Sequence, residues 1–120
     1  MTNIAWSHLP NAKHIDAVLA DVKARPEGWT TARDAAWDAA QRAAWDAART
    51  AAWDAAQRAA WDAAQRAARD AIAALVTWDS SADLLDCTPD VLRTMIDLAE
   101  PPVCHQAALL LPYAIVRFGA

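Results

Sequence analysis

Residues 35–66 read AAWDAAQR, AAWDAART, AAWDAAQR and AAWDAAQR, and a degenerate AARDAIAA follows at residues 67–74. From residue 31 to residue 78 the chain contains neither glycine nor proline. Alanine is the strongest helix former, and arginine and glutamine are good ones. The sequence therefore predicts a helix of roughly 45 residues that starts at a capping-box-like Thr31 and Asp34, and that would span about 70 Å as one unbroken rod.

Tryptophan recurs at every eighth residue of this stretch, at Trp29, Trp37, Trp45, Trp53 and Trp61. Eight residues turn a helix by about 800°, so each indole is rotated by about 80° from the last and the rings spread around the whole helix. Asp and Arg four residues apart in the neighbouring row add weak ion pairs. Large apolar rings on every side of the helix have to be covered from several directions.

Two arrangements would cover these rings. Either the helix is continuous and is wrapped by the terminal helices and by copies of itself, or it breaks near Arg49 and Thr50 or near Arg69 and Asp70. The shorter helices of a broken rod would pack on each other across their alanine rows. The chain has few large aliphatic residues outside the repeat, so we favour self-association into a homo-oligomer. The predicted oligomer core consists of Trp37, Trp45, Trp53 and Trp61.

The flanking segments predict further helices. Residues 11–25 are amphipathic and start at Asn11, a good N-cap residue, and residues 26–28 should break the chain. Thr88, Pro89 and Asp90 form an N-cap, a first-turn proline and a first-turn acid for a helix that ends before Pro101. Residues 103–118 are almost wholly apolar and should be buried, and Pro112 should end or kink a helix there.

These elements predict an all-α helical bundle in a single domain, residues 1–120. Its parts are an N-terminal helix and linker (1–28), the Ala/Trp repeat helix (29–78), long and possibly broken, and a C-terminal segment with two helices (79–120). The length of 120 residues and the mass of 13.0 kDa suit one small domain.

Charge and composition restrict the function. The formal net charge of −4 lies entirely in residues 71–120, because residues 1–30 hold three basic and three acidic side chains and residues 31–70 hold six Arg and six Asp. A protein that binds phosphate backbones needs a basic face, so we do not expect duplex DNA as a partner. No eighteen residues in a row lack a charge, so we expect no membrane span. With two cysteines and no visible signal peptide, we expect a cytoplasmic protein with reduced thiols.

Catalytic and metal-binding groups are sparse. Neighbouring helical residues point about 100° apart, so Cys104 and His105 would not form a nucleophile and base pair. A distant histidine, His8 or His14, is the alternative base, and a buried structural thiol is the favoured interpretation. Cys87, Cys104 and His105, with another His, have zinc-ligand chemistry without a recognised spacing. Three acids at i, i+4 and i+7 would share a helical face, where a solvated surface is favoured over a cation site: Asp79, Asp83 and Asp86. We expect no enzyme and no cofactor.

The repeat also offers a binding hypothesis. Aromatic faces stack on bases, and arginine contributes cation–π contacts and bidentate phosphate recognition. Helices from two or more chains could therefore form a pocket for a nucleotide-like ligand. The simpler alternative is that the rings are packing groups and that each Arg is paired with a nearby Asp. The pocket residues would be Trp37, Trp45, Trp53, Trp61, Arg42, Arg58 and Arg66.

The AAWDAA repeats, followed by TWDSSADLLDCTPDVLRTMIDLAEPPVCHQAALLLPYAIV at residues 77–116, resemble small alanine-rich proteins of bacteria and their phages. The resemblance implies a host-interaction or anti-defence role and no particular site residues. Our leading hypothesis is a non-enzymatic, self-associating helical protein whose acidic C-terminal segment meets a protein partner. The alternatives are an oligomeric protein that sequesters a nucleotide-like signal and a low-complexity helical spacer.

Overall fold

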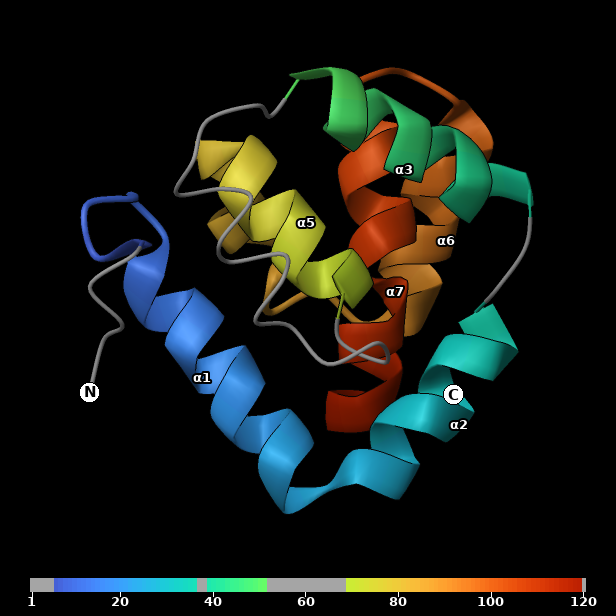
Figure 1. Cartoon of the computed structure of the whole chain (residues 1–120). Helices are drawn as coiled ribbons and strands as arrows, with labels where there is room; N and C mark the ends of the chain where they lie inside the picture. The colour runs from blue at the N-terminus through green and yellow to red at the C-terminus, as the bar shows by residue number, and fades with distance from the viewer. Residues whose placement is uncertain (1–5, 37–38, 52–68, 120) are drawn as a thin grey trace.

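The computed structural model describes residues 6–36, 39–51 and 69–119. No strand occurs among these residues, and the predicted all-α helical bundle is confirmed (Figure 1). The α-helices are α1 (Ala12–Ala24), α2 (Pro26–Ala36), α3 (Ala39–Ala51), α5 (Arg69–Thr77), α6 (Pro89–Leu98) and α7 (Val103–Phe118), and a 3₁₀ helix, η3 (Asp79–Leu84), joins α5 to the C-terminal pair.

The side chain of Asn11 does not cap α1. Asn11 precedes the helix as predicted, but its side chain makes no capping hydrogen bond. Instead the Nδ2 amide, buried in the core, donates to the carbonyl oxygens of Leu75 at 3.0 Å, Asp79 at 3.1 Å and Trp78 at 3.4 Å. These carbonyls belong to the end of α5 and the start of η3, where helical partners run out. Asn11 therefore ties the first helix to the end of α5.

The predicted break over residues 26–28 is wrong. Only Arg25 separates α1 from α2, and α2 begins at Pro26. Proline suits the first position of a helix, because the N–H that it lacks would have no intrahelical partner there. Thr31 consequently lies inside α2, so the predicted helix start at Thr31 and Asp34 is wrong as well.

The repeat segment does not form one straight rod. Helices α2 and α3 run in different directions, and α5 lies between α1 and α7 (Figure 1). The longest dimension of the molecule is 36 Å, about half the length of the rod at 1.5 Å per residue. The arrangement with shorter, mutually packed helices is therefore the observed one. The predicted break near Arg49 and Thr50 lies in the last turn of α3, and α5 begins at Arg69, the site of the other predicted break. Residues 37–38 and 52–68 lie outside the described part.

The centre of the fold is α7, not the repeat. This helix packs against α2, α3, α5 and α6 (Figure 1). Burying a leucine stabilises the fold by roughly 1.5–3 kcal/mol, several times the contribution of an alanine methyl, so α7 contributes more apolar burial than the alanine-rich helices. Pro112 lies inside α7 and does not end it, so the prediction that this proline ends a helix is wrong. The buried residues of α7 are Cys104, Gln106, Ala107, Ala108, Leu109, Leu110, Leu111, Pro112, Ala114 and Ile115.

The C-terminal helices follow their sequence signals. The Thr88 hydroxyl accepts a hydrogen bond from the Val91 N–H, and Pro89 occupies the first turn of α6, as predicted. The helix ends at Leu98, and the left-handed backbone of the next residue, Ala99 (φ 53°), stops it before the two prolines. Helices α6 and α7 thus form a closely packed pair, which we call the C-terminal hairpin.

Candidate functional site

Of the residues predicted to form the Trp and Arg pocket, the structure describes only Trp45 and Arg42. Trp37, Trp53, Trp61, Arg58 and Arg66 lie outside the described residues. Trp45 is half-buried against the core of its own chain, and its Nε1 donates to Asp70 Oδ1 at 2.6 Å. Arg42 is exposed on α3. Trp45 therefore packs within the chain, as the simpler alternative for these rings assumes.

A buried polar network joins the repeat to α7. Asp70 is only 2% exposed and accepts from the Trp45 indole and, at 3.5 Å, from the Gln41 amide. Gln41 is 1% exposed and also donates to the carbonyl oxygen of Ala108 at 3.3 Å. In a regular helix that carbonyl would accept from residue 112, but Pro112 has no N–H. The repeat glutamine therefore satisfies a carbonyl that the proline of α7 leaves without its helical donor.

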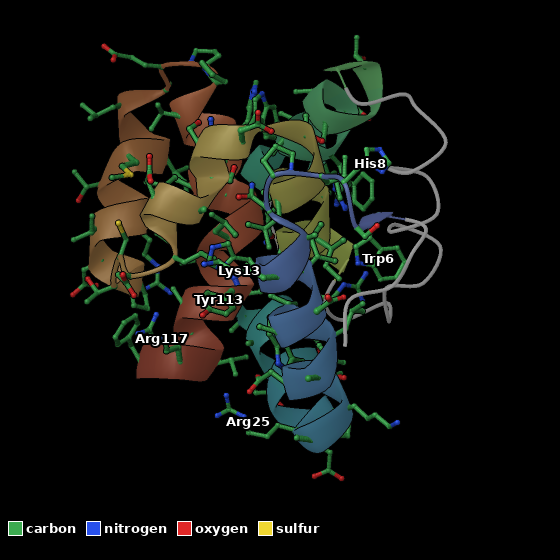
Figure 2. All side chains as sticks on the ribbon, turned by 90° about the vertical axis from the view of Figure 1, so that its left-hand side faces the viewer. Trp6, His8, Lys13, Arg25, Tyr113 and Arg117 are labelled. Carbon is green, nitrogen blue, oxygen red and sulfur yellow. The ribbon has the colours of Figure 1, made fainter. Side chains whose placement is uncertain are left out.

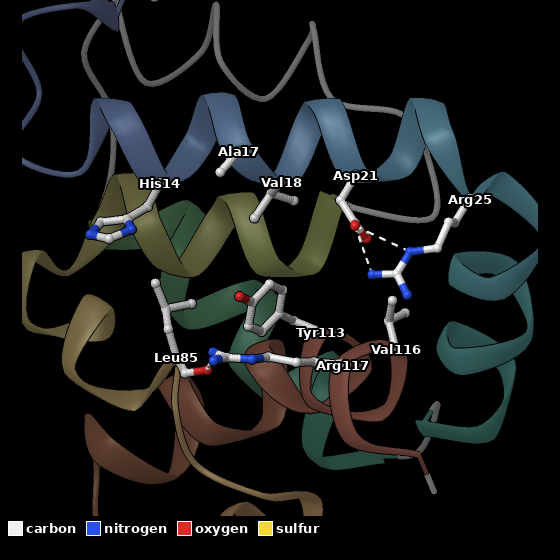
Figure 3. A pocket seen from close by; sticks show the side chains of 9 residues that line it. All are labelled: His14, Ala17, Val18, Asp21, Arg25, Leu85, Tyr113, Val116 and Arg117. Atoms are coloured by element: carbon white, nitrogen blue, oxygen red, sulfur yellow. Dashed lines mark hydrogen bonds and ion pairs between the residues drawn. The ribbon is translucent and has the colours of Figure 1, made fainter.

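A cleft of about 290 Å³ lies between α1 and the last turns of α7 (Figure 3). Figure 2 shows Tyr113, Arg117 and Arg25 at the end of the molecule where these helices approach each other. The walls combine apolar groups from both helices and from Leu85 with five polar side chains. The cleft is lined by His14, Ala17, Val18, Asp21, Arg25, Leu85, Tyr113, Val116 and Arg117.

Asp21 and Arg25 form the α1 side of this cleft. The Arg25 guanidinium donates from Nη2 and Nε to Asp21 Oδ1, at 2.7 and 3.2 Å. The indole of Trp29 donates to the other oxygen, Oδ2, at 2.6 Å. Both oxygens of Asp21 thus have donors from within the chain, and the carboxylate joins α1 to α2. The Trp29 ring also lies against Tyr113, with centroids 6.0 Å apart, which fixes the tyrosine on the α7 side.

Arg117 forms the opposite side. Its Nη1 donates to the Leu85 carbonyl at 3.0 Å and to Asp86 Oδ1 at 2.7 Å. The hydrogen bond to Asp86 raises the pKa of the Arg117 guanidinium, and desolvation opposes the rise. A guanidinium has five N–H donors, so Nε and Nη2 keep donors beyond these two bonds. Asp86 is not part of the cleft lining.

The remaining predicted chemistry is not assembled into a site. Cys87 and Cys104 are free thiols, and Cys104 is buried. The imidazole of His14 lies in the cleft with Tyr113. Tyr113 is roughly 13 Å along α7 from Cys104 at 1.5 Å per residue, so the structure does not bring His14 and Cys104 together. Among the described residues no three His, Cys, Asp or Glu side chains are grouped so that they could hold a metal ion.

The predicted acidic helical face is wrong. Asp79 and Asp83 belong to η3, a 3₁₀ helix, and Asp86 follows it. A 3₁₀ helix has three residues per turn, so residues four apart do not share a face. Asp86 pairs with Arg117 instead.

The C-terminal hairpin carries an apolar and acidic surface. The large apolar side chains exposed in the described part are Val91, Leu98, Val103 and Phe118, all of α6 and α7. Leu98 is the most exposed, at 65%. Arg117 covers the Phe118 ring, with 5.0 Å between the guanidinium carbon and the ring centroid. We call the following set the hairpin surface: Val91, Leu98 and Val103 with the exposed acids Asp90, Asp97 and Glu100.

Comparison with protein-family models, curated proteins and solved structures gives no match to this chain. Within the residues that the structure describes, none of the helices combines the length and apolarity that crossing a bilayer requires.

Proposed function

We propose that this protein is a non-enzymatic interaction module whose hairpin surface binds a basic, amphipathic segment of a partner protein. The observation that supports this proposal is the grouping of exposed apolar side chains with acidic ones on one pair of helices. Soluble proteins seldom expose several large apolar side chains together without using them for contact.

The apolar part of the hairpin surface follows from helix geometry. Val91 and Leu98 are seven residues apart on α6, so they lie on one face two turns from each other. Val103 starts α7, five residues after Leu98. A partner helix whose apolar residues also recur every seven positions would cover Val91, Leu98 and Val103, as amphipathic helices do when they bind an apolar groove.

The acidic part defines the chemistry of the partner. Asp97 and Glu100 are exposed beside Leu98, and neither has an ion-pair partner among the described residues. Asp90 faces Arg93 only at 3.9 Å, and its side chain is 99% exposed. Exposed pairs of this kind contribute little, so the field around the strip is negative. Charge complementarity therefore favours a partner rich in Lys or Arg.

A peptide titration tests the proposal. The probe is a synthetic amphipathic helix of lysine and leucine, and the control peptide replaces each lysine by glutamate. We expect the amide signals of α6 and the first turn of α7 to shift with the lysine peptide only. Leu98→Ser removes an exposed side chain with no loss of core packing, and should weaken binding by about tenfold because the leucine would be buried by the partner.

Two charge-matched variants separate the hairpin surface from general attraction to an acidic protein. Each variant is a double substitution that removes two negative charges. The first combines Asp97→Asn with Glu100→Gln, and the second combines Asp79→Asn with Asp83→Asn. The first pair should weaken peptide binding and the second should leave it nearly unchanged. Equal weakening by both pairs, or shifts that map to α1 and α2, would overturn the proposal.

Self-association through the repeat is a separate proposal. Trp37, Trp53 and Trp61 would supply its contacts, because an eight-residue spacing would direct the rings around a helix and Trp45 is engaged within its own chain. Native mass spectrometry of gently purified protein tests it. A discrete oligomer supports self-association, an oligomer with a reproducible extra mass supports the ligand-sequestering alternative, and a bare monomer contradicts both.

A further inference from the structure

We propose that the cleft between α1 and α7 binds a small organic monoanion, namely a carboxylate on an aromatic or branched aliphatic body. The proposal is independent of the hairpin surface. It rests on the size of the cleft, on the two guanidinium groups that face it and on its apolar walls.

The cleft is small and shaped by two helices. Its volume of about 290 Å³ is at the lower limit of ligand pockets, so it suits a molecule of fragment size. Ala17, Val18, Leu85 and Val116 supply apolar wall, and the Tyr113 ring stands between α1 and α7 in Figure 3. An aromatic or branched body would replace water along these surfaces.

The charges of the lining favour an anion with one negative charge. Arg25 lines the cleft from the end of α1 and Arg117 from α7, and Asp21 is the acidic residue of the lining. Both oxygens of Asp21 already accept hydrogen bonds, from Arg25 and Trp29, so the carboxylate offers little to a cationic ligand. The lining itself holds two guanidinium groups and one carboxylate. Asp86, which pairs with Arg117 at 2.7 Å, lies outside the lining and is 87% exposed, so water screens its charge. The small positive excess that is left suits a carboxylate better than a phosphate dianion.

Arg117 would provide the main contact to the ligand. Its bonds to Leu85 and Asp86 both start at Nη1, so the N–H groups of Nε and Nη2 remain for the neighbouring Tyr113 hydroxyl and for a ligand carboxylate. Those two bonds also hold the guanidinium in place, which reduces the ordering that binding requires. Its side chain is 43% exposed, so a ligand can reach it.

Benzoate is the test ligand, and benzamide is its neutral isostere. We expect benzoate to shift the amide signals of Ala17, Tyr113 and Val116 in a saturable way, with a Kd on the order of 1 mM for a molecule of this size. Benzamide at the same concentrations should shift them far less. Arg117→Gln should weaken benzoate binding by roughly tenfold or more, and Arg117→Lys, which keeps the charge, should retain part of it.

Arg93→Gln is the matched control variant, because Arg93 is also 43% exposed and also faces an aspartate, but lies on α6 outside the cleft. It should bind benzoate like the parent protein. Absence of saturable shifts at the cleft, equal binding of benzamide, or equal loss in Arg93→Gln and Arg117→Gln would overturn the proposal. If Arg117→Gln unfolds, Arg117→Lys and the comparison of benzoate with benzamide decide the question.

Discussion

Replacing Gln41 tests how the repeat is joined to the central helix. Gln41→Met keeps the length and most of the volume of the side chain but removes both amide donors. The Ala108 carbonyl would then lose the donor at 3.3 Å that stands in for the missing N–H of Pro112. A buried acceptor without a partner costs about 1–3 kcal/mol, so we expect Gln41→Met to lower the free energy of unfolding by that amount.

Pro112→Ala restores the helical donor and completes a double-mutant cycle. Residue 112 would then supply an N–H to the Ala108 carbonyl, at the expense of the buried proline ring. In this background Gln41→Met no longer leaves the Ala108 carbonyl without a donor, and the contact with Asp70 that it removes is a long one, at 3.5 Å. Its cost should therefore fall by about 1 kcal/mol or more, which is the coupling energy between the two positions.

Urea unfolding of the four proteins, followed by circular dichroism at the helical band, measures this coupling. Trp45→Phe is the control, because it acts on Asp70 and not on the Ala108 carbonyl. Its effect should add to that of Pro112→Ala to within about 0.5 kcal/mol. If the effects of Gln41→Met and Pro112→Ala are equally additive, the proposed role of the repeat glutamine is refuted.

Other buried contacts give further predictions, each measured by thermal or urea unfolding. Asn11→Ala should lower the free energy of unfolding by about 1–3 kcal/mol, and Asn11→Asp should lower it more, because a carboxylate would face three carbonyl oxygens. If the aspartate is tolerated, the residue acts as a helix cap instead. Trp45→Phe should cost roughly 1.5–3 kcal/mol through the lost bond to the buried Asp70 carboxylate, and a change below about 0.5 kcal/mol would contradict that bond. Thr88→Ala should lower the free energy of unfolding by about 1 kcal/mol and Tm by roughly 4–8 °C, while Thr88→Asp should restore the cap. An unchanged stability of Thr88→Ala would show that the 3.4 Å bond is not stabilising.

Local signals in the sequence predicted the C-terminal half of the fold well. The Thr88 cap, the first-turn Pro89 and the stop before Pro101 act within a few residues of each other, so their geometry follows from the sequence alone. Pro26 was harder to interpret, because a proline can end one helix or begin the next. The choice depends on whether the chain turns just before it, and here Arg25 makes the turn.

Tertiary contacts explain what the sequence did not predict. Asn11 has the chemistry of a cap, but three carbonyls some sixty-five residues away compete for its amide. The repeat gives the same glutamine several times, and nothing in its spacing tells which copy will lie beside the carbonyl that Pro112 frees. A proline inside an apolar helix does signal that some side-chain donor is needed at the residue four positions before it.

The candidate sites likewise divide into features with a local sequence signal and features that depend on tertiary contacts. The acidity of residues 71–120 was visible in the sequence, and it lies on the surface as expected. The cleft was not visible, because His14, Asp21 and Arg25 are brought to Tyr113 and Arg117 only by the packing of the first helix near the end of the last. Their separation along the chain, almost its full length, left no local pattern.

Hydrogen exchange of the full chain, resolved by residue, tests most directly whether α7 organises this molecule. Buried helices at the centre of a fold open only with global unfolding, whereas peripheral ones open at lower cost. We expect the amides of Leu109, Leu110 and Leu111 to exchange slowest and those of α3 to exchange faster. Slower exchange in α3 than in α7 would contradict it and would return the central role to the alanine and tryptophan repeat.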